Sequence, residues 1–240
     1  STCFSGASAT SVVVTTSSVA QCCIPREAFT PINGVICNSH ILGTMPTWKD
    51  ITTANPAHSE NYAQRWKAFV AQGKDIDGEA RLIDATVPRH ARILDAGCGT
   101  GRVGGYLAQR GHEVIGTDLD PILIGHAKED FPDATWLVGD LSEDEIPAHD
   151  IDVAVCAGNV MGFLDPAGRA PALENIFRAL RPGGRLFVGF GAGRGWSFDD
   201  FLATAKEVGF AVQYCYESWD LQPFTQDSAF LVAQLARPGE

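Results

Sequence analysis

The chain has 240 residues, enough for one domain of ordinary size with a single sizeable hydrophobic core. Aspartate and glutamate outnumber lysine and arginine by 29 to 18, which gives a formal net charge of −11. Because binding to nucleic acid or to an anionic membrane draws on clustered positive charge, this balance argues against both kinds of partner. No apolar run approaches the roughly 18 residues that a membrane-spanning helix needs. We therefore expect a soluble, cytoplasmic protein.

Residues 1–44 differ in composition from the rest of the chain. They are rich in serine, threonine and valine, they hold four of the seven cysteines, and their only charged side chains are Arg26 and Glu27. The segment lacks the basic start of a signal peptide and the arginines of a transit peptide. We expect it to be an extension foreign to the natural protein, with Met45 as the natural start. The alternative is a genuine but disordered tail, and the intact mass of the native gene product distinguishes the two.

Two helices are expected before the first strand. The first covers residues 59–73, with Ser59 as its N-cap. Four side chains at helical spacing form one apolar face: Tyr62, Trp66, Phe69 and Val70. The last three are expected to pack in the core, whereas Tyr62 would line the polar edge. The second helix covers residues 78–87 and ends before Pro88, because proline cannot continue a helix.

Residues 92–118 carry the most informative pattern in the chain. A buried strand ends in Asp95, a turn contains three alternate glycines, a helix follows, and a second strand, 114–117, leads directly to Asp118. The glycines of the turn are Gly97, Gly99 and Gly101. Glycine lets the backbone approach a ligand, the helix N-terminus offers free N–H groups, and a carboxylate about 20 residues on accepts hydrogen bonds from ribose hydroxyls. This layout predicts half of a binding site for an adenosine-containing cofactor.

Two cofactor classes fit this half-site. Residues 99–104 also spell Gly-x-Gly-x-x-Gly, the pattern of a nicotinamide or flavin dinucleotide site. Asp95 would lie close to a pyrophosphate, which is unfavourable, whereas its charge suits the ammonium group of a methionine moiety. A third strand, 135–138, ends in Gly139 and Asp140, and an acid there can accept a hydrogen bond from the adenine amino group. These acids favour S-adenosylmethionine.

Residues 94–102, Leu-Asp-Ala-Gly-Cys-Gly-Thr-Gly-Arg, resemble the first motif of class I S-adenosylmethionine-dependent methyltransferases. The resemblance extends through Gly-Thr-Asp-Leu-Asp-Pro at 116–121 and Val-Gly-Asp-Leu at 138–141, and in element order from about Asn55 to the C-terminus. It implies a doubly wound, Rossmann-like α/β fold: a seven-stranded, mostly parallel sheet with an antiparallel C-terminal edge strand and N-terminal cap helices. In this interpretation residues 45–88 form the cap helices and 89–240 the cofactor-binding core, together one globular domain.

The resemblance also implies the cofactor contacts. The expected cofactor is S-adenosyl-L-methionine, which leaves as S-adenosyl-L-homocysteine. Residues that match the family's contacts to methionine, ribose and adenine are Asp95, Gly97, Gly99, Gly101, Asp118, Leu119, Asp140 and Leu141. From the first cap helix, Arg65 or Tyr62 is a candidate to hold the cofactor's carboxylate.

A continuous apolar strand, 151–156, opens into Ala-Gly-Asn-Val-Met-Gly-Phe at 157–163, where the family places its fourth motif beside the transferable methyl group. Small residues such as Ala157 let the backbone approach, and Asn159 is a candidate to orient the acceptor, although asparagine also forms turns. An Asn-Pro-Pro-Tyr-type tetrapeptide is absent, which disfavours methylation of DNA bases. No acid occupies this strand end, so a catechol-type magnesium site is disfavoured and no metal is expected.

The C-terminal part is expected to approach the acceptor. After an Arg-Pro-Gly-Gly turn, a strand at 185–190 leads to a loop at the active-site end, and a helix begins at Ser197. Strands at 211–217 and 228–235 form the antiparallel edge. The candidate acceptor contacts lie in the two loops: Arg194, Trp196, Trp219 and Asp220. The two tryptophans could instead be packing residues.

Methyl transfer from a sulfonium depends mostly on orientation and desolvation, so no nucleophilic side chain is required. We find no Ser-His-Asp or Cys-His constellation and no general base, which favours an acceptor that is nucleophilic by itself: a thiol, a free amine or a soft metalloid anion. The chain looks like a bacterial stand-alone small-molecule methyltransferase, a group that includes enzymes grouped with tellurite detoxification. Its oligomeric state is left open. The alternatives are an NAD(P)-dependent oxidoreductase and a non-catalytic S-adenosylmethionine-binding protein.

Overall fold

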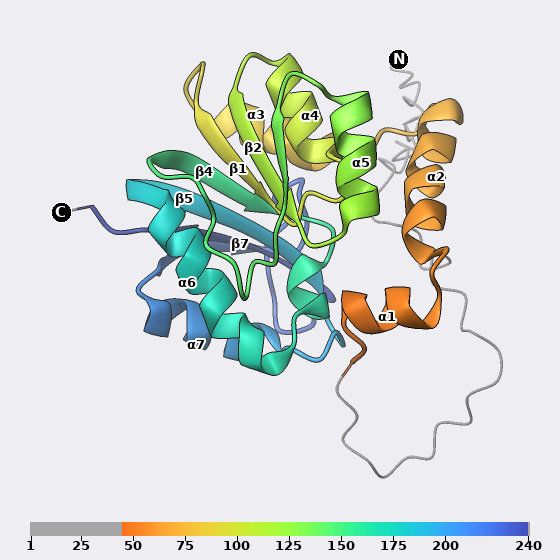
Figure 1. Ribbon diagram of the computed structural model, residues 1–240. Helices are drawn as coiled ribbons and strands as arrows, with labels where there is room; N and C mark the ends of the chain where they lie inside the picture. The colour runs from red at the N-terminus through yellow and green to blue at the C-terminus, as the bar shows by residue number, and fades with distance from the viewer. Residues whose placement is uncertain (1–44, 240) are drawn as a thin grey trace, which may run out of the picture. The chain divides into compact units, whose positions relative to one another are not determined.

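The computed structural model describes residues 45–239 of the chain. The expectations for residues 1–44 fall outside the described residues. Within the described part, one mixed sheet carries helices on both of its faces (Figure 1). None of the helices in this part has the length and apolar character needed to cross a bilayer.

The sheet contains seven strands in the order β3-β2-β1-β4-β5-β7-β6. Strands β1 to β5 pair in parallel, whereas β7 is antiparallel to both of its neighbours and leaves β6 at the edge. The expected doubly wound, mostly parallel sheet with an antiparallel C-terminal edge is therefore confirmed. The strand bounds are β1 (Arg92–Ala96), β2 (Glu113–Asp118), β3 (Thr135–Val138), β4 (Ile151–Cys156), β5 (Leu180–Gly191), β6 (Ala211–Tyr216) and β7 (Phe230–Ala236).

Helix ends follow the local sequence signals. Asp120 accepts hydrogen bonds at the start of α5 and is followed by Pro121. The Ser197 side chain accepts from the backbone at the start of α7, where the sequence predicts that a helix begins. Gly209 ends α7 in the left-handed conformation that favours glycine. The helix bounds are α1 (Trp48–Ala54), α2 (His58–Ala71), α3 (Gly78–Thr86), α4 (Arg102–Gln109), α5 (Pro121–Asp130), α6 (Arg169–Ala179) and α7 (Phe198–Val208), with 3-10 helices η2 (Val160–Phe163) and η3 (Pro166–Gly168).

Both faces of the central strands are buried, because successive side chains of a strand point to opposite faces. On β4, Val153 and Val155 pack in one cluster with residues of α3 and α4, whereas Ala154 and Cys156 pack in another with residues of α6 and α7. The continuous apolar pattern of this strand follows from its place between two helix layers.

The N-terminal helices differ from expectation in three ways. Helix α1 was not expected, and its signal is a capping box between Thr47 and Asp50. Helix α2 begins one residue before Ser59, so Ser59 is not its cap, and Val70 is 58% exposed rather than part of the core. The fully buried Ile83 shows that α3 belongs to the layer that covers the sheet, whereas α1 and α2, here called the lid, stand apart from the sheet (Figure 1).

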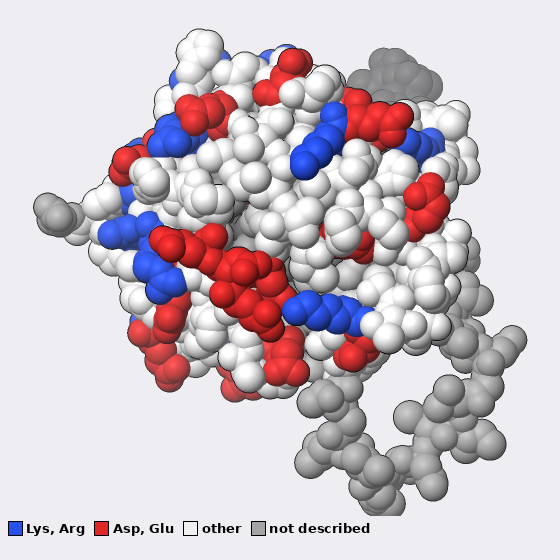
Figure 2. Space-filling model, in the orientation of Figure 1, with Lys and Arg blue, Asp and Glu red and all other residues white. Residues whose placement is uncertain are grey.

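Acidic side chains spread across one face of the molecule, with a band over the segment between β3 and β4 (Figure 2). Glu143, Asp144 and Glu145 of this segment are exposed, as expected of a solvated loop. These three side chains contribute to the excess of acidic residues in the composition.

Candidate functional site

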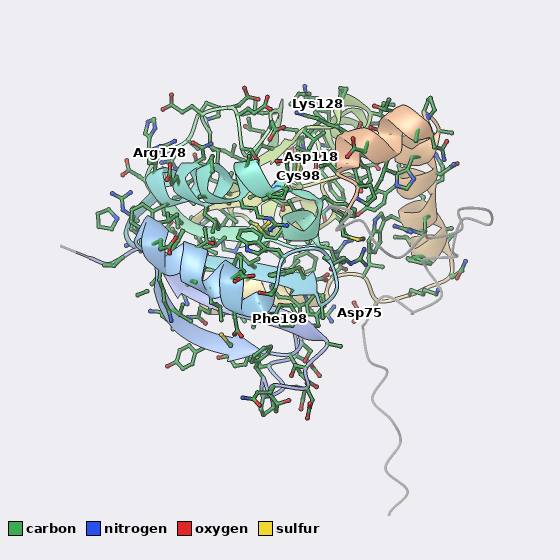
Figure 3. All side chains as sticks on the ribbon, turned by 90° about the horizontal axis from the view of Figure 1, so that it is seen from below. Asp75, Cys98, Asp118, Lys128, Arg178 and Phe198 are labelled. Carbon is green, nitrogen blue, oxygen red and sulfur yellow. The ribbon has the colours of Figure 1, made fainter. Side chains whose placement is uncertain are left out.

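A cavity opens at the carboxyl ends of the parallel strands. In open α/β sheets ligands bind at this end, where the loops that follow the strands converge. Its walls come from the segments after β1, β2, β3 and β4, and from the lid and η2. Asp118, at the end of β2, and Cys98, after β1, lie close together (Figure 3), and both line the cavity.

The three glycines of the turn after β1 serve two different purposes, close packing and access for a ligand. Gly97, Gly99 and Gly101 all have positive φ, at 75°, 55° and 77°. A Cβ on Gly97 would lie 2.5 Å from Val160, and one on Gly101 would lie 2.9 Å from Trp136, so these two glycines permit close packing. A Cβ on Gly99 would meet only Tyr62, at 3.8 Å. Gly99 is therefore the turn residue whose missing side chain leaves room for a ligand.

Asp118 joins the glycine turn to the segment after β2. Its Oδ2 accepts a hydrogen bond from the Gly99 N–H at 2.9 Å, and its Oδ1 accepts from the Asp120 N–H at 2.9 Å. Burial raises the pKa of this carboxyl to about 6. Since each carboxylate oxygen can accept a second hydrogen bond, Asp118 keeps acceptor capacity for hydroxyl groups in the cavity.

Asp95 is only 2% exposed. Its Oδ2 accepts from the Gly104 N–H at 2.7 Å, which anchors the first turn of α4. Burial is the largest effect on this carboxyl and raises its pKa to about 7. Asp95 thus combines a structural bond with a negative charge in the cavity wall that a bound cation would stabilise.

Asp140 faces the cavity from the segment after β3. Its Oδ2 forms an ion pair with Lys49 Nζ at 2.7 Å, and its Oδ1 accepts from the Ser142 N–H at 2.9 Å. Burial acts to raise the pKa of Asp140, but the hydrogen bonds from Lys49 and Ser142 outweigh it and the pKa is lowered. The structure therefore brings all three predicted acids, at the ends of three strands, into one cavity.

Aromatic side chains close the cavity on the lid side. The Trp48 ring meets Tyr62 and Phe163 edge-on, with centroid distances of 5.5 and 5.6 Å. Tyr62 reaches both glycine segments, since its ring lies near Gly99 and its hydroxyl is 4.0 Å from a Cβ placed on Gly158. Trp48 and Phe163 were not among the predicted site residues, because their contribution depends on how the lid and η2 fold back over the sheet.

Of the two residues predicted to hold the cofactor's carboxylate, only one lines the cavity. Tyr62 lines the cavity, whereas the Arg65 guanidinium lies 4.9 Å from the Tyr62 ring centroid and does not line the cavity. A different arginine does: Arg102, which stacks on Trp66 at 4.5 Å and forms two 2.8 Å hydrogen bonds with Glu79. Its place directly after the glycine motif, at the first position of α4, was the available sequence signal.

Ala157 lines the cavity, but Asn159 does not. Asn159 has a left-handed backbone with φ of 66°, and its Oδ1 accepts from the Gly191 N–H at 2.8 Å. This bond ties the end of β4 to the end of β5. The geometry agrees with the turn-forming alternative, and the role of Asn159 in orienting an acceptor stays a prediction.

The four candidate acceptor contacts lie outside the cavity lining of the described residues. Trp196 is 3% exposed and packs edge-on against Phe201 in the core. The Trp219 ring covers Gly189, where an added Cβ would lie 2.4 Å from a ring atom. Both tryptophans thus have the packing role that the sequence left open.

The two polar candidates lie elsewhere. The side chain of Arg194 packs across Gly162, with its Cβ 2.7 Å from the position that a Cβ on Gly162 would take. Asp220 is exposed and accepts a hydrogen bond from the Ser218 hydroxyl. Among residues 45–239, no group of three or more histidine, cysteine, aspartate and glutamate side chains is arranged to hold a metal ion.

Comparison with known proteins finds methyltransferases. Residues 93–184 match a family model described as a methyltransferase domain. A crystal structure of a TehB-like S-adenosylmethionine-dependent methyltransferase from Corynebacterium glutamicum is 64% identical, covers 76% of this chain and 100% of its own, and has a TM-score of 0.75. The N-methyltransferase NodS of Bradyrhizobium japonicum, solved with S-adenosylhomocysteine, shares the fold at 20% identity and a TM-score of 0.55, over 67% of this chain and 85% of its own.

Curated relatives match over shorter segments. An uncharacterized methyltransferase of Mycobacterium tuberculosis is 35% identical over 130 residues, which are 53% of this chain and 49% of that protein. A malonyl-[acyl-carrier protein] O-methyltransferase of Pectobacterium atrosepticum is 35% identical over 117 residues, 48% of this chain and 44% of that protein. The chain thus spans about half the length of the curated relatives it matches. Since it covers the whole of the Corynebacterium protein at 64% identity and carries the three acids and the glycine turn in one cavity, the chain belongs to the S-adenosylmethionine-dependent methyltransferases.

Proposed function

We propose that the cavity binds S-adenosylmethionine and that the protein transfers its methyl group to a small-molecule acceptor that is nucleophilic without a protein base. The observation that carries the proposal is the convergence of Asp95, Asp118 and Asp140 around one cavity whose wall is open at Gly99. When bound, the cofactor supplies an activated methyl group on a sulfonium centre.

We assign each of the three aspartates to a different polar part of the cofactor. Asp118 would accept hydrogen bonds from the ribose hydroxyls, because both of its oxygens face the cavity loops and keep acceptor capacity. Asp140 and the neighbouring Leu141 would face the adenine edge. Asp95 would lie toward the ammonium group of the methionine moiety, whose charge would stabilise the ionised carboxylate.

The acceptor side of the cavity is mostly apolar. Val160, Phe163 and Leu164 line it from the segment after β4, and Trp48 and Tyr62 line it from the lid. Such walls exclude water and leave orientation as the main contribution of the protein. No histidine or lysine is among the described residues that line the cavity. Burial raises the pKa of the Tyr62 hydroxyl, which keeps it protonated and unsuited to act as a base at neutral pH.

This arrangement favours acceptors whose reactive atom already carries an available lone pair: a thiolate, a free amine or a soft metalloid anion. A weakly acidic hydroxyl would need a base to remove its proton. Malonyl-acyl-carrier protein is the acceptor in the name of one relative, of which this chain matches only 44%, and its malonyl thioester is included in the test as a competing acceptor. A cytoplasmic location stays a prediction from the sequence.

The first test is calorimetric titration of the full chain with S-adenosylhomocysteine and, separately, with NADH. We expect micromolar binding of the first and none of the second, and the reverse would replace the methyltransferase with an oxidoreductase. The second test incubates the protein and S-adenosylmethionine with a matched panel of a thiol, an amine, a soft metalloid anion, a phenol and the malonyl thioester, and measures S-adenosylhomocysteine formed. Turnover of the phenol alone contradicts the base-free acceptor, whereas the malonyl carboxylate is already ionised at neutral pH and needs no base. Binding without any turnover indicates a non-catalytic binder.

A further inference from the structure

The segments that follow β2 and β3 make contacts in two directions. Toward the cavity they present Asp118 and Asp140, and toward the lid they bind side chains of α1 and α2. A residue that serves both directions would connect the state of the cavity to the position of the lid.

Asp120 is the residue that makes most of these connections. It is 4% exposed, and its Oδ1 accepts from the Ile122 N–H at 2.9 Å at the start of α5. Its Oδ2 accepts from Trp48 Nε1 at 2.8 Å and from the Ser59 hydroxyl. Its own N–H donates to Asp118 Oδ1 at 2.9 Å. One carboxylate and its backbone thus join α1, α2, the start of α5 and the proposed ribose-binding acid.

The bond to Trp48 fixes a ring that closes the cavity. Trp48 contacts Tyr62 and Phe163 edge-on, and all three rings line the cavity. A second connection runs beside it, because Lys49, the next residue of α1, forms the 2.7 Å ion pair with Asp140. Both segments that would hold the adenosine moiety therefore also hold α1.

We propose that Asp120 is a positioning residue that couples cofactor binding to closure of the lid, so that the acceptor wall formed by Trp48 and Phe163 is complete only when the cofactor is in place. The proposal rests on the proposed binding of S-adenosylmethionine in this cavity. Coupling of this kind is reciprocal: whatever affinity the closed lid adds to the cofactor, the cofactor adds to lid closure. The cofactor then binds before the acceptor.

Asp120→Asn tests the coupling with the smallest change. Asparagine is as good an N-cap as aspartate, so its Oδ1 keeps the bonds at the start of α5. Its amide NH₂ then faces Trp48 Nε1, and since the indole nitrogen only donates, this hydrogen bond is lost. Trp48→Phe removes the same bond from the other side and keeps an aromatic ring. Asp130→Asn is the matched control, because Asp130 also joins α5 to the lid, through an exposed ion pair with Lys67 at 3.5 Å.

The readouts are the dissociation constant for S-adenosylhomocysteine by calorimetry and amide hydrogen exchange in α1 and α4. We expect Asp120→Asn and Trp48→Phe each to weaken binding about 10-fold, and the double variant to be no weaker than the more affected single variant, because contacting residues are not additive. Asp130→Asn should change binding less than about twofold, as an exposed ion pair contributes little.

Hydrogen exchange distinguishes positioning from general destabilisation. In the unaltered protein, S-adenosylhomocysteine should slow exchange in both α1 and α4. In Asp120→Asn it should slow exchange in α4 but no longer in α1. Should Asp120→Asn fail to fold, Trp48→Phe gives the same comparison with the carboxylate intact. Absence of binding by the unaltered protein overturns both proposals, whereas binding and α1 protection that neither variant changes overturn the positioning role alone.

Discussion

Asp95 carries a charge that the protein by itself compensates poorly. It is 2% exposed and accepts one backbone hydrogen bond, from Gly104, and burial raises its pKa from the ordinary 3.8 to about 7. Asp95→Asn keeps an oxygen for the Gly104 N–H and removes the charge. We therefore expect the variant without ligand to be more stable than the unaltered protein at high pH, and to bind S-adenosylhomocysteine more weakly.

The pH dependence follows from proton linkage. A carboxyl whose pKa is higher in the folded than in the unfolded chain binds an extra proton in the folded state, so the free energy of unfolding falls as pH rises between the two values. The pKa of Asp95 is 3.8 in the unfolded chain and about 7 in the folded protein. At roughly 1.4 kcal/mol per pKa unit, ionisation of Asp95 therefore lowers the free energy of unfolding by about 4 kcal/mol near pH 8 and by about 2 kcal/mol near pH 5.5. Asparagine does not titrate, so its stability advantage should grow by about 2 kcal/mol between these two conditions.

The assay is urea unfolding of both proteins at the two pH values, followed by circular dichroism. Titrating groups that do not interact with Asp95 contribute equally in both proteins and cancel in the difference, whereas Asp118 interacts with it and does not cancel fully. A difference that does not change with pH, or a variant that is less stable near pH 8, would refute the assignment of a buried, ionised Asp95. Titration of both proteins with S-adenosylhomocysteine near pH 7.5 then checks the cost in cofactor affinity.

Three further substitutions test the site and its support. Asp118→Ala should weaken binding of S-adenosylhomocysteine about 10- to 100-fold in calorimetry, from loss of roughly 1.5–3 kcal/mol of charge-assisted hydrogen bonding, and an unchanged dissociation constant removes Asp118 from the site. Gly189→Ala should lower the free energy of unfolding by about 1–3 kcal/mol, since its Cβ would lie 2.4 Å from an indole ring, whereas Gly125→Ala, with no atom within 4 Å, should not lower it. Glu79→Ala should cost roughly 3–5 kcal/mol in urea unfolding, because Arg102 is left buried without its partner, and a loss below 1 kcal/mol contradicts that reasoning.

The sequence predicts the elements whose signals are local. The bounds of β3 and β4 agree with the predicted strands, because a short apolar run between turn residues specifies a covered strand. Helix α1 was missed because seven residues are too few for an apolar period to be visible, and its capping box was the only signal. The face of α2 was misplaced at Val70 because burial there depends on α5, which packs against α2 from far along the chain.

The candidate site also contains residues whose place follows from local sequence signals and residues whose place depends on distant contacts. The convergence of Asp95, Asp118 and the glycine turn on one cavity was predictable, since they lie at the ends of strands whose order fixes where they meet. The acceptor side was not, because Trp219 lies on the sheet only where Gly189 leaves room for a ring, a match between residues 30 positions apart. Trp48 closes the cavity for a comparable reason, since its partner Asp120 is 72 positions away.

The place of β7 has a consequence for how the protein is made. This strand lies between β5 and β6, yet it is the last of the seven to leave the ribosome. Until residues 230–236 emerge, β6 has no partner and β5 presents an open edge, both sites at which strands of other chains can pair. Long-range pairing of this kind is slow to form and exposed to aggregation while it is incomplete. A nascent chain stalled after β6 therefore presents two open strand edges, and dependence on chaperones should be greatest at that length.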